Sequence, residues 1–364
     1  MRYLIGLLML VHGLIHLLGF IKAFGISQIN QLPREISKPV GTIWLVTALL
    51  MIIASATIVF KKEGWWGIAL AGALLSQLLI FLYWKDAKFG TIPNLMILLV
   101  AMPAFFEWNF ETKFKRDVTE SLNPNNHKET LLTIERISHL PEPVQRYLIY
   151  SGALNKPVLS NFKIKFEGRI RSDGKSAWMP FTTEQYNFIE NPSRLFFMKA
   201  KMKGLPVTGY HAYKNGLATM DIRLLSVFTV QYQAGMEMNV AETVTWLNDL
   251  CLYAPAALID KRIHWETIDR LQVKAVFQQE GINVAATLQF NENGELTNFV
   301  SEDRYRILSN SDRKQIRFST PVKNYIDVDG RKVPGFGEAV WHLPDGALTY
   351  GEFTCTAIEY NVTK

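Results

Sequence analysis

The sequence begins with an apolar stretch, YLIGLLMLVHGLIHLLGFIKAF at residues 3–24, and three further apolar runs follow at residues 40–60, 66–84 and 92–108. Each run is close to the ~20 residues that a helix needs to cross ~30 Å of hydrocarbon. A segment inside a bilayer must satisfy its own backbone hydrogen bonds, so continuous apolar runs of this length predict helices. Residues 1–109 are therefore predicted to form a four-span transmembrane domain.

The remainder of the chain is water-soluble in composition and nearly neutral. The chain has 39 Lys and Arg residues and 33 Asp and Glu residues. Eight of the basic and four of the acidic residues lie in residues 1–109, which leaves 31 basic and 29 acidic residues for the rest of the chain. This interleaved charge argues against nucleic-acid binding. Basic residues flank the two sides of the predicted bundle almost evenly, so the positive-inside rule leaves the orientation open. The two cysteines, Cys251 and Cys355, fit no metal motif, and whether they pair stays open.

Polar residues within apolar spans are costly unless they find partners, so they mark either a site or a packing contact. His12 and His16 are four residues apart and share one helix face. The loop WKDAKFGTIPN adds Asp86, Lys88 and Asn94, and these five residues are predicted to form a membrane polar cluster. The histidines fit either a metal or haem site, or hydrogen bonds across a helix interface. Since no third ligand lies nearby in the sequence, the second interpretation is favoured and no cofactor is predicted.

A linker and a two-helix collar are predicted at residues 110–158. Residues 110–128 are charged and then polar, with an Asn-Pro-Asn-Asn turn. Apolar residues at helical spacing predict a helix at residues 129–139, and a second helix at residues 144–150 lies between a proline and a glycine.

After the collar the hydrophobic period changes to two. FKIKFEGRI at residues 162–170 alternates apolar and polar side chains, as a strand with one buried face does. Further strands are expected along the chain, separated by turns such as Asn215-Gly216 that favour hairpins. One helix, at residues 241–253, interrupts them after the sixth strand. Residues 159–364 are therefore predicted to form an antiparallel β half-barrel covered by one helix, which makes the whole chain α+β.

The whole chain resembles an uncharacterised bacterial membrane-protein family whose domain has no known function. The matching segments are HGLIHLLGFIKAF, WKDAKFGTIPN, LPEPVQRYL, WLNDLCLYAPAALIDKRIHWETID and GRKVPGFGEAVWHLPDGALTYGEF. The β domain also looks like the half-barrel of bacterial lipoprotein-sorting carriers. That resemblance implies a concave apolar cavity for acyl chains and favours an extracytoplasmic β domain. The chain as a whole is expected to be a multi-pass protein of the bacterial inner (cytoplasmic) membrane. The resemblance assigns no activity, because a fold alone does not determine function.

The aromatic residues of the β domain are numerous for one sheet, and we expect them to line either a core or a lipid-sized pocket. A single curved sheet with one helix can hardly bury them all, which favours a pocket. Methionines would add an adaptable lining. The predicted ligand-binding residues are Trp178, Tyr186, Phe197, Tyr210, Trp246, Tyr253, Trp265 and Trp341.

No GxSxG, HExxH, P-loop or GxGxxG motif occurs in the sequence. Glu242, Asp249 and Asp260 flank the lone helix, and Asp221 lies with Arg223 on a strand. A pair of these carboxylates near a cavity could do acid–base work, while helix capping and surface charge are the simpler interpretation. The leading hypothesis is a non-enzymatic membrane protein whose β domain binds a lipid, an acylated protein or another amphipathic ligand. The alternatives are a membrane redox or metal protein that uses the two bundle histidines, and a membrane-tethered interaction or sensory module with an unidentified protein partner.

Overall fold

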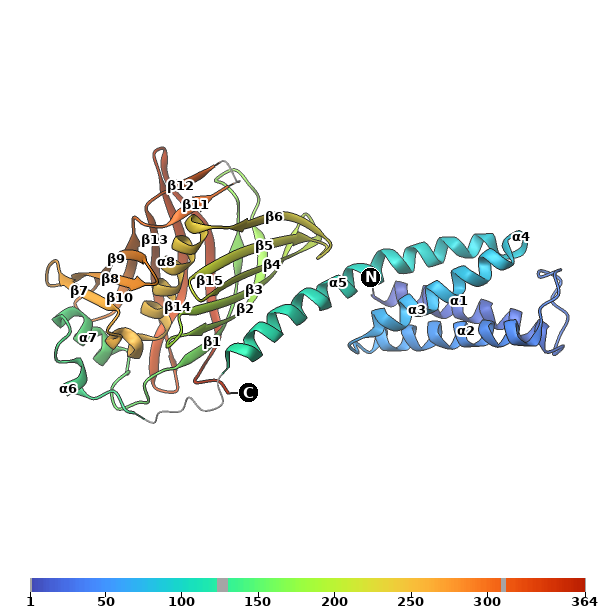
Figure 1. Ribbon diagram of the computed structural model, residues 1–364, viewed down its shortest axis with the longest axis horizontal. Coiled ribbons are helices and arrows are strands. Elements are labelled where there is room, and N and C mark those ends of the chain that lie inside the picture. Colours follow the sequence, from blue (N-terminus) through green and yellow to red (C-terminus); the bar gives the residue numbers. More distant parts are fainter. Residues whose placement is uncertain (1, 123–129, 309–311, 364) are drawn as a thin grey trace. The chain divides into compact units, whose positions relative to one another are not determined.

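The structure is a computed structural model that describes residues 2–122, 130–308 and 312–363 (Figure 1). The chain divides into two compact units, Met1–Phe110 and Glu111–Lys364. The first unit is helical and the second contains the β-sheet, so the fold is α+β, as predicted.

The described part of the first unit contributes four helices that are long and apolar enough to cross a membrane. The predicted apolar runs are therefore all found as helices. The fourth helix continues past the predicted run, so residues 110–121, expected in a linker, are helical. The elements are α1 (Arg2–Ala23), α2 (Lys38–Val59), α3 (Trp65–Leu82), α4 (Trp84–Ala87), η1 (Lys88–Gly90) and α5 (Thr91–Ser121), and the boundary between the units falls inside α5.

Glycines on α1 let α2 approach it closely. A Cβ atom added at Gly13 would lie 2.9 Å from Met51 Cβ, and one added at Gly19 would lie 2.2 Å from Trp44 Cδ2. Larger side chains would therefore push the two helices apart, which is why small residues are common at helix interfaces in membranes. The Ser55 hydroxyl strengthens the same interface by donating to a carbonyl oxygen of α1 at 2.6 Å.

The second unit is built from antiparallel strands. They are β1 (Asn161–Ile170), β2 (Met179–Phe188), β3 (Ser193–Met202), β4 (Leu205–Lys214), β5 (Leu217–Leu224), β6 (Phe228–Ala234), β7 (Ile263–Thr267), β8 (Gln272–Gln279), β9 (Ile282–Phe290), β10 (Leu296–Ser301), β11 (Tyr305–Ile307), β12 (Arg313–Gln315), β13 (Phe318–Val328), β14 (Arg331–Leu343) and β15 (Gly346–Tyr360). Thirteen of them form one sheet in the order β6-β5-β4-β3-β2-β1-β15-β14-β13-β10-β9-β8-β7, while β11 pairs with β12. Neighbours in the sheet are mostly neighbours in sequence, which is the pattern of a meander.

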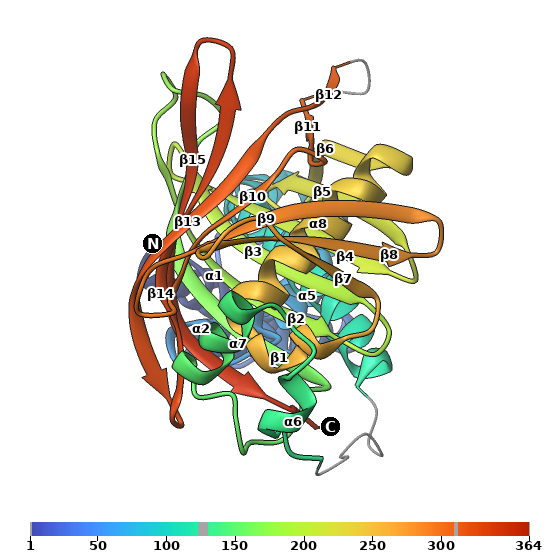
Figure 2. The ribbon, with the colours of Figure 1, turned by 90° about the vertical axis from the view of Figure 1, so that its left-hand side faces the viewer.

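Helix α8 (Met236–Tyr253) carries the chain from one edge of this sheet to the other. It follows the edge strand β6 and, through η2 (Pro255–Ile259), precedes β7 at the opposite edge. It contacts strands along the sheet, including β2 to β6, β9, β10 and β14. Register shifts in β1, β5 and β14 mark bulges, which bend strands. The helix therefore lies across the concave face of a curved sheet (Figure 2), and the predicted helix-covered half-barrel is confirmed.

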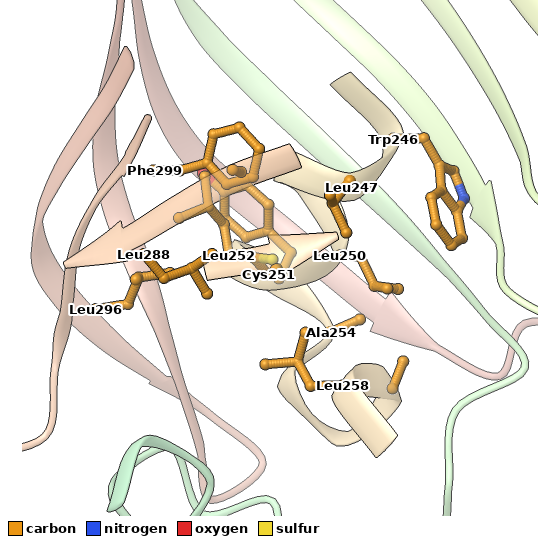
Figure 3. Close-up of a cluster of buried hydrophobic side chains, with 14 of the residues drawn as sticks. Trp246, Leu247, Leu250, Cys251, Leu252, Ala254, Leu258, Leu288, Leu296 and Phe299 are labelled. Atoms are coloured by element: carbon orange, nitrogen blue, oxygen red, sulfur yellow. The ribbon is translucent and has the colours of Figure 1, made fainter. Parts of the chain in front are cut away.

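The core of the second unit lies between α8 and the sheet. The Trp246 ring is fully buried 4.8 Å from the Phe277 ring, and its Nε1 donates to the Phe188 carbonyl oxygen at 3.0 Å. Nearly every residue of α8 is buried, so its polar side chains need partners inside the protein. Figure 3 shows part of this core, with Trp246, Leu247, Leu250 and Cys251 of α8 and Leu288, Leu296 and Phe299 of β9 and β10.

The first helix of the predicted collar is shorter than expected, and the second begins two residues earlier than expected. Helix α6 spans only Ile134–Ile137, and α7 spans Glu142–Tyr150. Leu131 forms a β-bridge with Pro157 instead of extending α6. Pairing with a segment beyond α7 thus overrides the helical pattern there. The remaining part of the expected linker and first collar helix, residues 123–129, lies outside the described residues.

Candidate ligand-binding site

A cavity of about 140 Å³ lies between one face of α8 and the concave side of the sheet. Strands β1 to β4 contribute one part of its lining and β13 to β15 another. Arg304, in the loop before β11, completes it. Polar side chains occupy one part of the lining and apolar side chains the rest.

One face of α8 supplies the polar residues nearest the helix. Glu242, Thr245, Asn248, Asp249 and Leu252 all line the cavity and are buried. Their spacing of three to four residues places them on the same side of the helix. The opposite side of α8 packs into the apolar core. Because four of the five residues are polar, the lining needs hydrogen-bond partners from the strands.

Arg194 of β3 supplies most of these partners. Its Nε donates to Asp249 Oδ2 at 2.7 Å, its Nη1 to Glu242 Oε2 at 3.1 Å and its Nη2 to Gln185 Oε1 at 3.0 Å. Gln185 Nε2 also donates to Asp249 Oδ2 at 2.8 Å, and His211 Nδ1 lies 3.2 Å from Glu242 Oε1. This buried network joins α8 to β2, β3 and β4. Removing one charged member would leave the others uncompensated.

Burial and the Arg194 charge determine how the two carboxylates ionise. Burial opposes the charged form of Glu242, but the Arg194 guanidinium and the His211 hydrogen bond lower its pKa to about 2. Burial raises the pKa of Asp249, and the donors around it offset only part of that effect. Glu242 is therefore the more firmly ionised partner of Arg194. Neither carboxylate is a surface charge or a helix cap, which was the simpler interpretation of the sequence.

Three buried polar atoms in the lining have no hydrogen-bond partner among the described residues: Asn248 Oδ1, Thr320 Oγ1 and Arg304 Nε. The Asn248 and Thr320 residues are only 7% and 8% exposed. The rest of the Arg304 guanidinium is held in place, since its Nη1 donates to the Tyr350 hydroxyl at 2.8 Å and its Cζ lies 4.1 Å from the Phe318 ring centroid. Leaving a buried polar group unpaired costs about 1–3 kcal/mol. The cavity thus offers hydrogen bonds that the protein itself does not use.

The rest of the lining is apolar and mostly aromatic. The Phe166 and Phe353 rings meet edge to face with their centroids 5.7 Å apart, and the Phe196 ring lies 5.5 Å from that of His211. Such a surface suits an aliphatic chain or an apolar ring. The apolar lining residues include Phe166, Ile170, Phe196, Met198, Leu252, Tyr253, Phe318, Tyr350 and Phe353.

The predicted ligand-binding tyrosines and phenylalanine fall in two places. Tyr253 lines the cavity. Tyr186, Phe197 and Tyr210 lie instead around Phe114 of α5, with ring centroids 6.1, 5.4 and 5.7 Å from that of Phe114. These three residues anchor the end of α5 on the sheet within the second unit.

The four predicted tryptophans are dispersed. Trp246 lies in the core, and Trp265 is half-buried against the same core. The Trp178 ring has two arginine guanidinium groups within 4.6 and 4.4 Å of its centroid. Trp341 stacks on Tyr350 at 5.7 Å, so it borders the cavity lining without forming it.

The residues that sequence reasoning did not single out are the polar ones, namely Arg194, Asn248, Arg304 and Thr320. They come from segments far apart in the chain, and no motif connects them. The sequence of the predicted covering helix contained one indication of a polar site. A helix that covers a half-barrel is buried, and polar residues spaced three to four apart on it point into the barrel rather than to solvent.

In the helical unit, Ser76 joins the two histidines of the predicted polar cluster. His12 Nε2 lies 3.0 Å from Ser76 Oγ and 2.9 Å from Asn94 Oδ1. His16 Nε2 lies 2.8 Å from the same Ser76 Oγ. These contacts are hydrogen bonds between helices, which is the second of the two interpretations of the histidines given above.

The other members of that predicted cluster lie apart from this network. Asp86 lines a cavity together with both histidines, whereas Lys88 is exposed with its Nζ over a phenylalanine ring. Within the described part of the chain, no group of three or more His, Cys, Asp or Glu side chains is placed to hold a metal ion. Cys251 and Cys355 are both buried and unpaired.

The fold and the cavity together define a half-barrel protein with a helix across its concave side and apolar helices at its N-terminus. Residues 130–353 match DUF6544, a family of unknown function, and the chain belongs to that family. The predicted membership of a family without known function is thus confirmed. No curated protein matches the chain.

Solved structures similar to this chain include the following three. A LolA-superfamily protein from Nitrosomonas europaea is 12% identical, with a TM-score of 0.34 over 59% of this chain and 92% of that one. A DUF1329-family protein from Desulfovibrio piger is 10% identical, with a TM-score of 0.34 over 61% of this chain and 91% of that one. A β-barrel-like DUF1849 protein from Brucella abortus is 8% identical, with a TM-score of 0.22 over 56% of this chain and 98% of that one. At these values the likeness concerns the fold alone.

Proposed function

We propose that the second unit binds an amphipathic ligand in the cavity beside α8, without changing it chemically. The observation that carries this proposal is the presence of three buried, unpartnered polar atoms beside an aromatic wall. A polar group on the ligand would give Asn248, Thr320 and Arg304 the hydrogen bonds that they lack. Its apolar part would pack against side chains such as Phe196 and Phe353.

The cavity size limits which part of a ligand is buried. Its volume of about 140 Å³ is close to the ~150 Å³ of engineered cavities that bind benzene. Pockets that enclose drug-sized ligands are larger, at ~300–1,000 Å³. The proposed occupant is therefore a short apolar segment and its adjoining polar group, rather than an entire lipid.

The unpartnered atoms also favour a particular polar group. Arg304 Nε needs an acceptor, whereas Asn248 Oδ1 needs a donor. An amide-linked acyl chain carries both groups side by side. An ester-linked chain carries only acceptors and would leave Asn248 unpaired. We therefore favour amide-linked acyl groups, whether on a lipid or on an acylated protein.

Native mass spectrometry of the full-length protein in mild detergent tests this proposal. Decanamide should bind, and methyl decanoate should bind about tenfold more weakly, because it leaves one buried acceptor unpaired. Replacing Ala339 in the lining by leucine should fill the cavity and abolish binding. The matched control is Ala347→Leu on an exposed part of β15. A native protein that binds neither compound, or binding that survives in Ala339→Leu, would overturn the proposal.

We further propose that the four apolar helices insert into the bacterial cytoplasmic membrane and that the second unit faces its outer side. Exposed large side chains on these helices, such as Leu4, Leu74 and Phe81, support contact with lipid. The resemblance of the β domain to the half-barrel of lipoprotein-sorting carriers favours the outer side. Membrane fractionation followed by protease treatment of spheroplasts tests both points. Recovery in the soluble fraction would contradict insertion, and protection of the second unit from protease would contradict the outer side.

A further inference from the structure

The helical unit contains a second cavity, of about 310 Å³. Its lining comes from α1, α2 and α3, from the loop between α1 and α2, and from the segment between α4 and the start of α5. Most of the lining is apolar and includes Ile15, Leu18, Leu32, Ile80 and Pro93. The cavity is independent of the one in the second unit.

Within the part of the chain that the structure describes, three buried polar atoms of this lining have no hydrogen-bond partner: His16 Nδ1, Trp44 Nε1 and Asp86 Oδ2. His16 and Trp44 are each only 2% exposed. Unsatisfied polar groups are especially costly among apolar helices, because no bulk water is present to pair with them. Three such atoms on one cavity indicate a place for a ligand that forms hydrogen bonds.

The hydrogen-bond network assigns the proton on His12. Asn94 Nδ2 donates to Gln77 Oε1 at 3.1 Å, so the other side of the Asn94 amide, its Oδ1, faces His12 Nε2 at 2.9 Å. An amide oxygen only accepts hydrogen bonds. His12 therefore carries its proton on Nε2.

The same reasoning assigns the proton on His16. Among the described hydrogen bonds, the Ser76 hydroxyl has only the Nε2 atoms of His12 and His16 as partners, at 3.0 and 2.8 Å. Because His12 Nε2 is protonated, the Ser76 proton goes to His16 Nε2. His16 then carries its own proton on Nδ1, which is the unpartnered atom. The indole Nε1 of Trp44 is always a donor, so the cavity presents two donors and one carboxylate acceptor.

Packing holds these donors in place. The Trp44 ring lies between His16 and Tyr83, with ring centroids 5.0 and 6.0 Å away. Gly19 packs directly against the indole, since a Cβ atom there would lie 2.2 Å from Trp44 Cδ2. Donors that are fixed before a ligand arrives lose little entropy when it binds.

We propose that this cavity binds a membrane-soluble molecule with a hydroxyl group on an apolar ring, of the phenol or quinol type. A hydroxyl oxygen has two lone pairs that can accept from His16 Nδ1 and Trp44 Nε1, and its proton can be donated to Asp86 Oδ2. The apolar lining accommodates the ring. A carbonyl or an ether would satisfy the two donors and leave the carboxylate unpaired.

Binding of 4-octylphenol and 4-octylanisole to the full-length protein in nanodiscs tests this proposal without any substitution. The two compounds differ at the oxygen alone, where a methyl group in the anisole replaces the hydroxyl proton of the phenol. Equilibrium dialysis against empty nanodiscs corrects for partition into lipid. We expect saturable binding of the phenol and about tenfold weaker binding of the anisole, because the anisole leaves Asp86 unpaired. Equal affinities, or no saturable binding of the phenol, would overturn the proposal.

Two variants separate the roles of acceptor and donor. Asp86→Ala should remove the preference, so that both compounds bind within about twofold of each other. His16→Phe should weaken both compounds about tenfold and keep the preference, because it removes a donor that both oxygens use. Glu63→Ala, on an exposed turn of the same unit, is the matched control and should change neither affinity. A preference that persists in Asp86→Ala would contradict the assignment of the carboxylate.

Discussion

Replacing Thr320 by valine should stabilise the ligand-free protein. The Thr320 hydroxyl is buried in the cavity lining and has no hydrogen-bond partner, so the folded state bears the cost of removing it from water. Valine has almost the same shape and puts a methyl group where the hydroxyl was. The substitution therefore removes the cost without creating a void.

The expected magnitude follows from the cost of an unpaired buried group, which is about 1–3 kcal/mol. We expect the free energy of unfolding of the second unit to rise by about 1 kcal/mol, since the site is next to a cavity and its environment is not fully apolar. For a domain of this size, 1 kcal/mol corresponds to roughly 2–4 °C in Tm. A bound ligand that uses the hydroxyl should reverse the sign, because the variant would lose part of the ligand's stabilisation.

Thermal unfolding of the full-length protein, followed by the loss of β-sheet signal in circular dichroism, measures this effect. The matched control is Thr208→Val, because Thr208 is equally buried on a strand but its hydroxyl lies 3.1 Å from that of Ser226. This control should lower the free energy of unfolding by about 1–2 kcal/mol. If Thr320→Val destabilised the protein as much as the control does, the Thr320 hydroxyl would have a partner and the reasoning would fail.

Three further predictions concern the network and the sheet. Arg194→Met should lower the free energy of unfolding by about 3–5 kcal/mol, because it leaves Glu242 and Asp249 buried without their cation. The folded-state pKa of Glu242 is lowered from 4.5 to about 2, so its ionisation stabilises the fold above pH 4.5 and this contribution disappears as the pH falls toward 2. The stability advantage of the native protein over Glu242→Gln should thus shrink by about 3 kcal/mol across that range, as measured by denaturant unfolding. Gly168→Ala should cost about 3 kcal/mol in thermal unfolding, since its Cβ would lie 1.9 Å from the Glu352 carbonyl oxygen on β15.

Specific results would contradict the predictions for Arg194→Met and Glu242→Gln, and Gly168→Ala has a matched control. Full stability of Arg194→Met would mean that the two carboxylates are protonated or hydrated in the folded state. A pH-independent difference for Glu242→Gln would mean that the carboxylate is not held ionised by its neighbours. The control for Gly168→Ala is Gly174→Ala, where the nearest atom to the added Cβ is 3.8 Å away and the change should stay within about 0.5 kcal/mol.

Much of the fold could be predicted because it depends on local patterns. Four apolar runs became helices, and alternating segments separated by turns such as Asn215-Gly216 became neighbouring strands of a meander. The errors lie where distant contacts override local preference. The charged segment at residues 110–121 continues α5, because Phe114 packs on aromatic rings of the sheet. The predicted helix at residues 129–139 is shortened, because Leu131 pairs with Pro157.

The candidate site was less predictable than the fold. Aromatic residues were abundant, but their number does not say which face of the sheet each one occupies. Tyr253 lies in the cavity, whereas Trp246, seven residues earlier on the same helix, lies in the core. Positions seven apart share one helix face, so the difference comes from the strands that each part of α8 meets. Trp246 packs on Phe277 of β8, whereas Tyr253 packs on Phe166 of β1.

The sequence by itself determined the elements of this protein: apolar helices, a long antiparallel meander and one helix between its sixth and seventh strands. Hydrophobic period and turn residues act over a few neighbouring positions, so they can be recognised without the fold. Only the tertiary structure decided that Asn248, Arg304 and Thr320 meet in one cavity, and that His16 and Asp86 meet in another. Whether a buried polar atom has a partner depends on every segment folded around it, and for this reason no short stretch of sequence reveals it.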